Sequence, residues 1–162
     1  MPAKTLMARA QAMLARRPYC RAELRRRLEP LAPRDEIESL LDRLEELRLL
    51  NDATYAYNFA FYRLGGRGYS PERVRRELEK RGVRASAVES ALSSVLAERT
   101  EAEILADYLG RRAAKRGLPA DRRSIEGLVR HLRRKGFGRE TIYRLLREQI
   151  PGAAWDSFEP GD

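Results

Sequence analysis

The chain has 162 residues, of which 43% are apolar and 35% are charged, and its formal net charge is +9. Its single cysteine, Cys20, excludes an internal disulfide and a four-cysteine metal site, and we expect it to be a small apolar residue in a reducing cytosol. No segment approaches the roughly 20 apolar residues of a membrane span, and no signal-peptide pattern is present. We therefore expect a cytoplasmic protein whose basic charge suits a polyanionic partner.

Three segments, taken in chain order, share one pattern of apolar residues at helical spacing. The pattern is formed by Leu24, Leu28, Ile37, Leu40 and Leu41, by Val74, Leu78, Val88, Ala91 and Leu92, and by Leu128, Leu132, Ile142, Leu145 and Leu146. Another amphipathic stretch precedes each segment, near Leu6, Tyr55 and Ile104. Each unit of about 50 residues is therefore predicted to contain three helices.

We predict an all-α fold of three tandem three-helix repeats at residues 1–50, 51–99 and 100–150, followed by a flexible tail at residues 151–162. Helix formers such as Ala, Leu, Arg and Glu dominate the composition. A repeat of this size buries too little apolar surface to be stable alone, so we expect the repeats to stack into an elongated, curved molecule. In the tail, Trp155 and Phe158 are candidates to dock on the third repeat.

Several residues mark the ends of the predicted helices. Ser70 before Pro71 is a favourable N-cap, and Asp52 and Asp121 can cap the helices that they precede. Two glycines that follow helices, Gly82 and Gly136, occupy equivalent positions in the second and third repeats, where a left-handed residue is common.

The sequence contains no recognisable catalytic or metal-binding motif. His131 is the only histidine, and we expect it on the surface, with its protonation disfavoured by Arg130, Arg133 and Arg134. The glycine-rich residues 64–69 are expected to form a flexible turn, because they lack the Lys-Ser/Thr pair of a phosphate-binding loop and a preceding strand. We therefore predict a protein that is not an enzyme, without a metal or cofactor.

Basic residues recur on the second helix of every predicted repeat, outside the apolar stripe. These candidate binding residues are Arg21, Arg25 and Arg26, then Arg73, Arg75, Arg76 and Lys80, and then Arg130, Arg133 and Arg134. If the repeats stack regularly, the side chains form a ladder of positive charge suited to phosphates or to carboxylates of a protein partner. The alternative is a solvated surface whose charge is neutralised by neighbours such as Glu23 and Glu77.

An aromatic cluster begins the second repeat. Tyr55, Phe59 and Tyr62 share one helix face and are predicted to be core residues. Tyr57 and Phe61 lie on a different side, so they either meet a neighbouring repeat or offer an exposed contact to a partner.

Two stretches in the middle of the chain carry a family resemblance. Residues 47–59, LRLLNDATYAYNF, and residues 67–83, RGYSPERVRRELEKRGV, resemble the central signature of the RecX family. Residues 18–24, PYCRAEL, match a further family motif, and the resemblance extends over roughly residues 5–150. One departure is Ser70, which stands where a glycine is common and which caps a helix equally well.

The resemblance implies a regulator of the bacterial recombinase RecA. Family members bind RecA filaments on single-stranded DNA and typically inhibit ATP hydrolysis, strand exchange and coprotease activity, which links them to recombination, DNA repair and the SOS response. The resemblance contributes no catalytic residue, and it extends the candidates for RecA or DNA binding to Arg67 and Arg81. We expect a monomer that binds single-stranded DNA weakly and without sequence preference.

The competing hypothesis is a transcription regulator with tandem helix-turn-helix units, since short helices joined by glycine-containing turns fit that motif. Against it, no predicted recognition helix has the Asn- or Gln-rich face that reads base edges.

Overall fold

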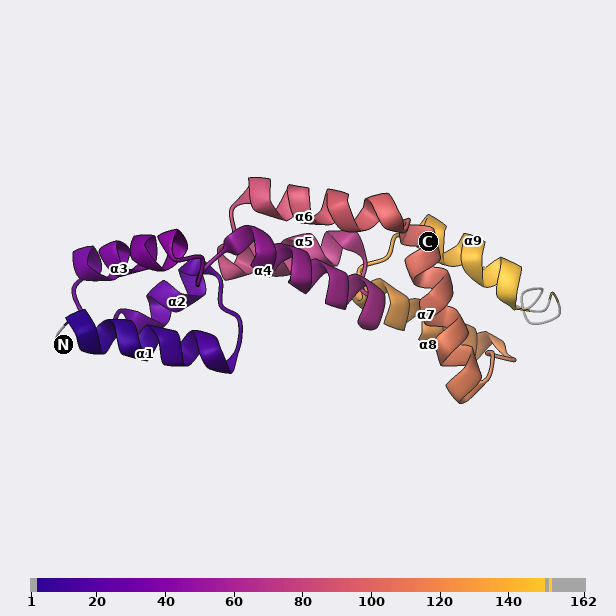
Figure 1. Ribbon diagram of the computed structural model, residues 1–162. Coiled ribbons are helices and arrows are strands. Elements are labelled where there is room, and N and C mark those ends of the chain that lie inside the picture. The colour runs from indigo at the N-terminus through magenta and orange to yellow at the C-terminus, as the bar shows by residue number, and fades with distance from the viewer. Residues whose placement is uncertain (1–2, 151, 153–162) are drawn as a thin grey trace. The chain divides into compact units, whose positions relative to one another are not determined.

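The computed structural model describes residues 3–150 and 152, and within them the chain forms α-helices joined by short connections (Figure 1). No β-strand occurs among these residues, so the predicted all-α fold is confirmed. The helices are α1 (Ala3–Arg16), α2 (Arg21–Leu28), α3 (Arg34–Glu46), α4 (Asp52–Phe61), α5 (Pro71–Arg81), α6 (Ala85–Glu98), α7 (Glu101–Arg116), α8 (Arg122–Arg134) and α9 (Arg139–Gln149). A π-helical turn, η1 (Tyr62–Gly66), continues α4.

The chain divides into two compact units. The first comprises Met1–Ala60 and Arg75–Ser94, and the second comprises Phe61–Val74 and Val95–Asp162. Helices α4, α5 and α6 therefore contribute residues to both units. Each of the ranges predicted as a repeat contains three of the α-helices, while the division into repeats at residues 50 and 99 stays a prediction. Apart from Gly152, the predicted tail, with Trp155 and Phe158, lies outside the described residues.

One apolar cluster in the core of the first unit is formed by the predicted apolar stripes of α1, α2 and α3. Leu24 and Leu28 on α2 are fully buried against Leu41 and Leu44 of α3 and Leu6 of α1. These residues are spaced by three or four positions along their helices, so each helix presents one continuous apolar face. In the second unit, the buried faces of α8 and α9 follow the same rule, with Leu128, Leu132, Ile142, Leu145 and Leu146 in its core.

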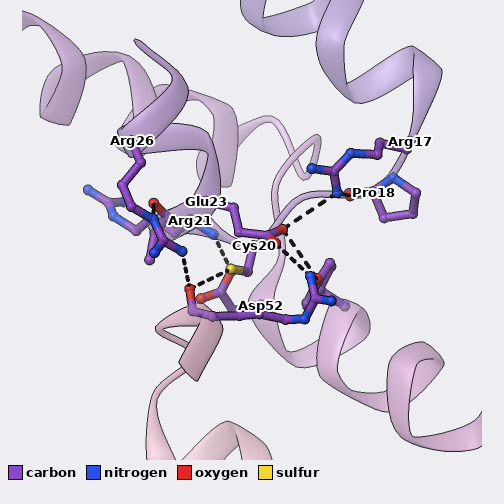
Figure 2. Close-up of polar contacts among 10 residues, drawn as sticks. Arg17, Pro18, Cys20, Arg21, Glu23, Arg26 and Asp52 are labelled. Atoms are coloured by element: carbon purple, nitrogen blue, oxygen red, sulfur yellow. Dashed lines mark hydrogen bonds and ion pairs between the residues drawn. The ribbon is translucent and has the colours of Figure 1, made fainter. Parts of the chain in front are cut away.

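Two of the three predicted N-caps are confirmed. The Ser70 Oγ accepts a hydrogen bond from the Arg73 backbone N–H at 3.1 Å, and Asp121 forms a reciprocal capping box with Ser124. Asp52 is the exception, because Asn51 caps α4 by accepting a bond from the Thr54 N–H at 3.0 Å. The Asp52 Oδ1 instead accepts from the Arg21 N–H at 2.7 Å, and so satisfies the first turn of α2 (Figure 2).

Gly82 and Gly136 end their helices in the same way. Both have positive φ, at 91° and 96°, as predicted. In each case the next residue donates a backbone hydrogen bond to a carbonyl five positions earlier, from Val83 to Leu78 and from Phe137 to Leu132. This is the Schellman geometry, in which a left-handed residue lets the last helical carbonyls find partners.

The connection after α4 differs from the expected flexible turn. Residues 62–66 form the π-helical turn, closed by a bond from the Arg67 N–H to the Tyr62 carbonyl at 3.2 Å. The prediction that Tyr62 is a core residue is wrong, because its α-helical register ends at Phe61 and Leu64 takes the buried position of the π turn. Tyr62 is 59% exposed.

Candidate nucleic-acid interface

Two of the predicted binding cations in the first unit are engaged by acidic residues of α3. The Arg21 guanidinium donates to Glu38 at 2.7 Å, to Asp42 at 2.8 Å and to Glu45 at 2.8 Å. Burial opposes its charge, yet these carboxylates raise the pKa of Arg21, while the hydrogen bond from Arg21 lowers the pKa of Glu38. Arg25 lies 2.6 Å from the other oxygen of Glu38. Both cations therefore hold α2 against α3.

Arg81 and Arg26 also make contacts within the first unit. The Arg81 guanidinium donates to Glu23 at 2.7 Å and lies 4.9 Å from the Phe59 ring centre, and the Tyr55 hydroxyl donates to Glu23 at 3.2 Å. Burial, followed by the nearby Glu23 carboxylate, raises the pKa of Tyr55 to about 12. Arg26 donates to the Arg81 carbonyl at 2.8 Å (Figure 2).

The remaining candidates on α5 in the first unit differ in their surroundings. Arg75 forms a two-pronged ion pair with Glu89 of α6, at 2.7 and 3.1 Å. Arg76 and Lys80 are exposed, and Lys80 forms no ion pair with any residue of the described chain. The candidates in this unit that face solvent are therefore Arg26, Arg76 and Lys80.

In the second unit, Tyr69 is surrounded by cations. The Arg73 guanidinium lies 3.8 Å from its ring centre, the Lys135 Nζ 4.9 Å and the Arg63 guanidinium 5.5 Å. Arg73 also donates to the Arg134 carbonyl, so it is held on the ring and is not a freely solvated side chain. Cation–π contacts of this kind fix the direction of the cation as well as adding stability.

Lys135 connects this cluster to the loop after η1. Its Nζ donates to the carbonyl of the candidate Arg67 at 2.6 Å, while the Arg67 residue itself is exposed. Burial, followed by the charges of Arg73, Arg67 and Arg111, lowers the pKa of Lys135. Burial and the neighbouring cations both disfavour the charged form of this lysine, and a bound anion would favour it.

The candidates on α8 are all on the exposed side of their helix. Arg130, Arg133 and Arg134 all face solvent, opposite the buried stripe that includes Ile125 and Val129. None of the three side chains forms an ion pair with residues 3–150. They are therefore able to contact an external anion without first breaking an internal salt bridge.

The excess of positive charge is larger in the second unit. Residues 61–74 and 95–150 carry 17 basic and 9 acidic side chains, a net charge of +8, whereas residues 1–60 and 75–94 carry 16 and 12, a net charge of +4. Positive charge of this density raises the local concentration of a polyanion and speeds its encounter with the protein.

The sequence-based set missed the cations of α7. Arg111, Arg112, Lys115 and Arg116 follow the spacing i, i+1, i+4, i+5, which places them on one side of a helix. Together with Gly66, Tyr108 and His131, they line a pocket of about 400 Å³. This spacing is visible in the sequence, but α7 is the first helix of its predicted repeat, whereas the predicted basic set lies on the second helices.

His131 is half-buried, which corrects its expected surface position. Its Nε2 lies 2.6 Å from the Tyr108 hydroxyl, and the two rings stack with centres 6.0 Å apart. The prediction that protonation of His131 is disfavoured is confirmed. Burial, followed by the charges of Lys135, Arg112, Arg134 and Arg116, lowers its pKa.

The described residues contain neither a metal-ligand cluster nor a membrane span. No group of three or more His, Cys, Asp or Glu residues there is arranged to hold a metal ion. No helix of that part of the chain combines the length and the apolar character needed to cross a membrane.

Comparison with known proteins places the chain among helical regulators. The family described as "RecX, second three-helix domain" matches residues 51–92. The regulatory protein RecX of Pseudomonas putida (strain GB-1) is 41% identical over 138 residues, covering 85% of this chain and 86% of that protein. The regulatory protein RecX of Thermobifida fusca (strain YX) is 35% identical over 150 residues, covering 90% of this chain and 80% of that protein.

The fold is shared with solved structures of lower sequence identity. The crystal structure of RecX from Lactobacillus salivarius superimposes with a TM-score of 0.72 at 21% identity, covering 90% of this chain and 95% of that one. A second crystal structure of a regulatory protein RecX gives a TM-score of 0.65 at 22% identity, covering 91% of this chain and 74% of that one.

Proposed function

Because the chain belongs to the RecX family of regulatory proteins, we propose that it regulates the recombinase RecA by binding RecA filaments on single-stranded DNA. The effect is inhibition of RecA's ATP hydrolysis, strand exchange and coprotease activity, in DNA repair and the SOS response. The protein acts in the cytoplasm as a monomer, by binding and not by catalysis.

The observation that carries this proposal is the set of exposed cations in the second unit. Arg67, Arg130, Arg133 and Arg134 face solvent, and the net charge of this unit over residues 61–74 and 95–150 is +8. Guanidinium groups bind phosphate and carboxylate oxygens through paired hydrogen bonds, and such contacts carry no base-sequence information. Binding of this kind suits a filament, which presents a DNA backbone and repeated acidic groups along its length.

We propose that binding is multivalent, with the exposed cations of both units contacting successive RecA protomers. Each contact can be weak while the whole chain binds tightly, because the second contact is intramolecular once the first has formed. The solvent-facing residues proposed for this role are Arg26, Arg67, Arg76, Lys80, Arg130, Arg133 and Arg134.

The test is RecA's ATPase on single-stranded DNA, titrated with wild-type and charge-reversed protein. Arg130→Glu with Arg133→Glu is expected to raise the half-inhibitory concentration at least tenfold. Arg73 is left unchanged, because its contacts with Tyr69 and the Arg134 carbonyl make its reversal a structural change. The matched control is Arg9→Glu with Arg16→Glu, which changes the net charge equally at exposed positions of α1.

Equal inhibition by wild type and the α8 variant, with both folded by circular dichroism, would overturn the role of α8. Absence of any wild-type effect on RecA would overturn the proposed function itself. Tight binding to one duplex sequence in the absence of RecA would instead favour a helix-turn-helix transcription regulator.

A further inference from the structure

The pocket beside α7 is lined by cations and, among the residues that the structure describes, by no carboxylate. Arg111, Arg112, Lys115 and Arg116 contribute four positive charges to a volume of about 400 Å³. None of the four side chains forms an ion pair with residues 3–150, so their charge is not neutralised there. A volume of this size lies within the range of about 300–1,000 Å³ that is typical of small-ligand pockets.

One of these cations is fixed in place before a ligand arrives. The Arg111 Nη2 donates to the Gly65 carbonyl at 2.9 Å, which holds the guanidinium at the end of η1. The other wall includes the Tyr108–His131 pair, whose hydroxyl and imidazole are joined at 2.6 Å. A preorganised donor loses less conformational entropy on binding than a mobile one.

An exposed aromatic ring lies next to the pocket. Gly66 lines the pocket, and the Tyr62 ring comes within 3.6 Å of the position that a Cβ on Gly66 would occupy. Tyr62 is 59% exposed, and the π turn that begins at this residue places it there. Single π turns inside α-helices are frequent at functional sites.

A ring beside a set of cations is the arrangement that binds single-stranded nucleic acid. The cations bind the backbone phosphate, while the aromatic face stacks on a base, which is accessible only when the strand is unpaired. An acidic peptide would use the cations but has no requirement for the ring. The combination therefore favours a nucleotide unit over a carboxylate.

We propose that the pocket formed by Arg111, Arg112, Lys115 and Arg116 binds a phosphate of single-stranded DNA, with Tyr62 stacking on a neighbouring base. The proposal rests on the proposed function only in taking single-stranded DNA as the nucleic acid. It assigns a DNA contact to α7, a helix that holds none of the basic residues predicted from the sequence.

The experiment measures binding of a fluorescent oligo(dT) strand by anisotropy, without RecA and across a series of salt concentrations. Tyr62→Ala is expected to weaken binding at least about fivefold, as for loss of one stacked base, whereas Tyr62→Phe keeps the wild-type affinity. Lys115→Gln with Arg116→Gln removes the phosphate contact of the pocket and should make the slope of log K against log salt less steep by about 0.7. Arg9→Gln with Arg16→Gln on α1 is the matched control and should leave that slope unchanged.

Three outcomes would overturn the proposal. The first is an unchanged affinity and salt slope in the folded pocket variants, and the second is an equal loss for Tyr62→Phe and Tyr62→Ala. The third is displacement of the strand by micromolar dTMP, which would assign the pocket to a free nucleotide.

A parallel RecA ATPase assay separates this inference from the proposed function. Loss of RecA inhibition with intact strand binding would assign the pocket to an acidic protein surface, against this proposal but not against RecA regulation. Strand binding through the pocket without any effect on RecA would support this proposal and contradict the proposed function.

Discussion

Gly136 lies against Ser70 so closely that a Cβ added to Gly136 would be 2.4 Å from the Ser70 Oγ. The same Cβ would lie 2.7 Å from the Cβ of Arg73, and the backbone of Gly136 has φ of 96°. Gly136→Ala is therefore expected to lower the free energy of unfolding by at least about 2 kcal/mol, from left-handed strain and overpacking together. Urea denaturation followed by circular dichroism measures this loss.

The matched control is the same substitution in an open helical position. Gly110 lies within α7 and an added Cβ there meets nothing within 4 Å. Gly110→Ala is expected to raise the free energy of unfolding by up to about 1 kcal/mol, because alanine has the higher helix propensity. If the two variants shift the urea midpoint in the same direction, the close packing at Gly136 is not what determines its effect.

Arg21 offers a second prediction, about the stability of the first unit. Arg21→Met keeps the apolar stem but removes hydrogen bonds to Glu38, Asp42 and Glu45. The expected loss is about 1–2 kcal/mol at pH 7, since these carboxylates are partly exposed and solvent weakens each contact. Urea denaturation of both proteins at pH 7 and pH 3 measures it.

The pH dependence of that loss follows from the lowered pKa of Glu38. A carboxylate with a depressed folded-state pKa contributes stability above its unfolded pKa of about 4.5, and this contribution disappears as pH falls through the folded value. The difference between wild type and Arg21→Met should therefore shrink at pH 3. A difference that is the same at both pH values would show that side-chain packing, and not charge, accounts for the loss.

His131 gives a third prediction, because the folded protein favours the neutral form of this side chain, whereas it favours the charged form of Glu38. Because its folded pKa lies below the unfolded value of about 6.5, the unfolded chain binds more protons as pH falls below that value. Stability is complete above about pH 6.5 and declines as pH falls from there toward the folded pKa. His131→Gln should flatten the decline of the urea midpoint between about pH 7 and pH 5. An unchanged pH profile in this variant would assign the decline to other groups.

Binding to DNA alone provides a fourth prediction. Three or four phosphate contacts from the exposed cations should give a slope of log K against log salt of about −2 to −3 on a single strand, from roughly −0.7 for each contact. Anisotropy titrations with random-sequence strands measure this slope. An affinity that does not change with salt would contradict phosphate binding by the basic residues.

The local features of the fold could be read from the sequence because they depend on residues close together in the chain. The apolar spacing around Leu24 and Leu128 predicts helices and their buried faces, and Ser70 and Asp121 cap the next turn. Cys20, which the sequence predicts to be a small apolar residue, has none of its surface exposed.

The contacts between distant residues could not be read in the same way. Asp52 binds the backbone of Arg21, 31 residues away, and Arg81 binds Glu23, 58 residues away. Sequence periodicity indicates which helix face is polar, but not which carboxylate a given cation meets once the helices pack. Arg21 therefore looked like a surface cation and proved to be an internal contact.

The burial of Cys20 has an experimental consequence. Its Sγ lies 3.5 Å from the Arg81 carbonyl, and burial raises the pKa of the thiol, so a thiol reagent can react only after the start of α2 has opened (Figure 2). Since the second unit has no cysteine, the labelling rate reports local opening of the first unit alone. A filament that binds the first unit should lower the labelling rate of Cys20. A filament that binds only the second unit should leave this rate equal to that of the free protein.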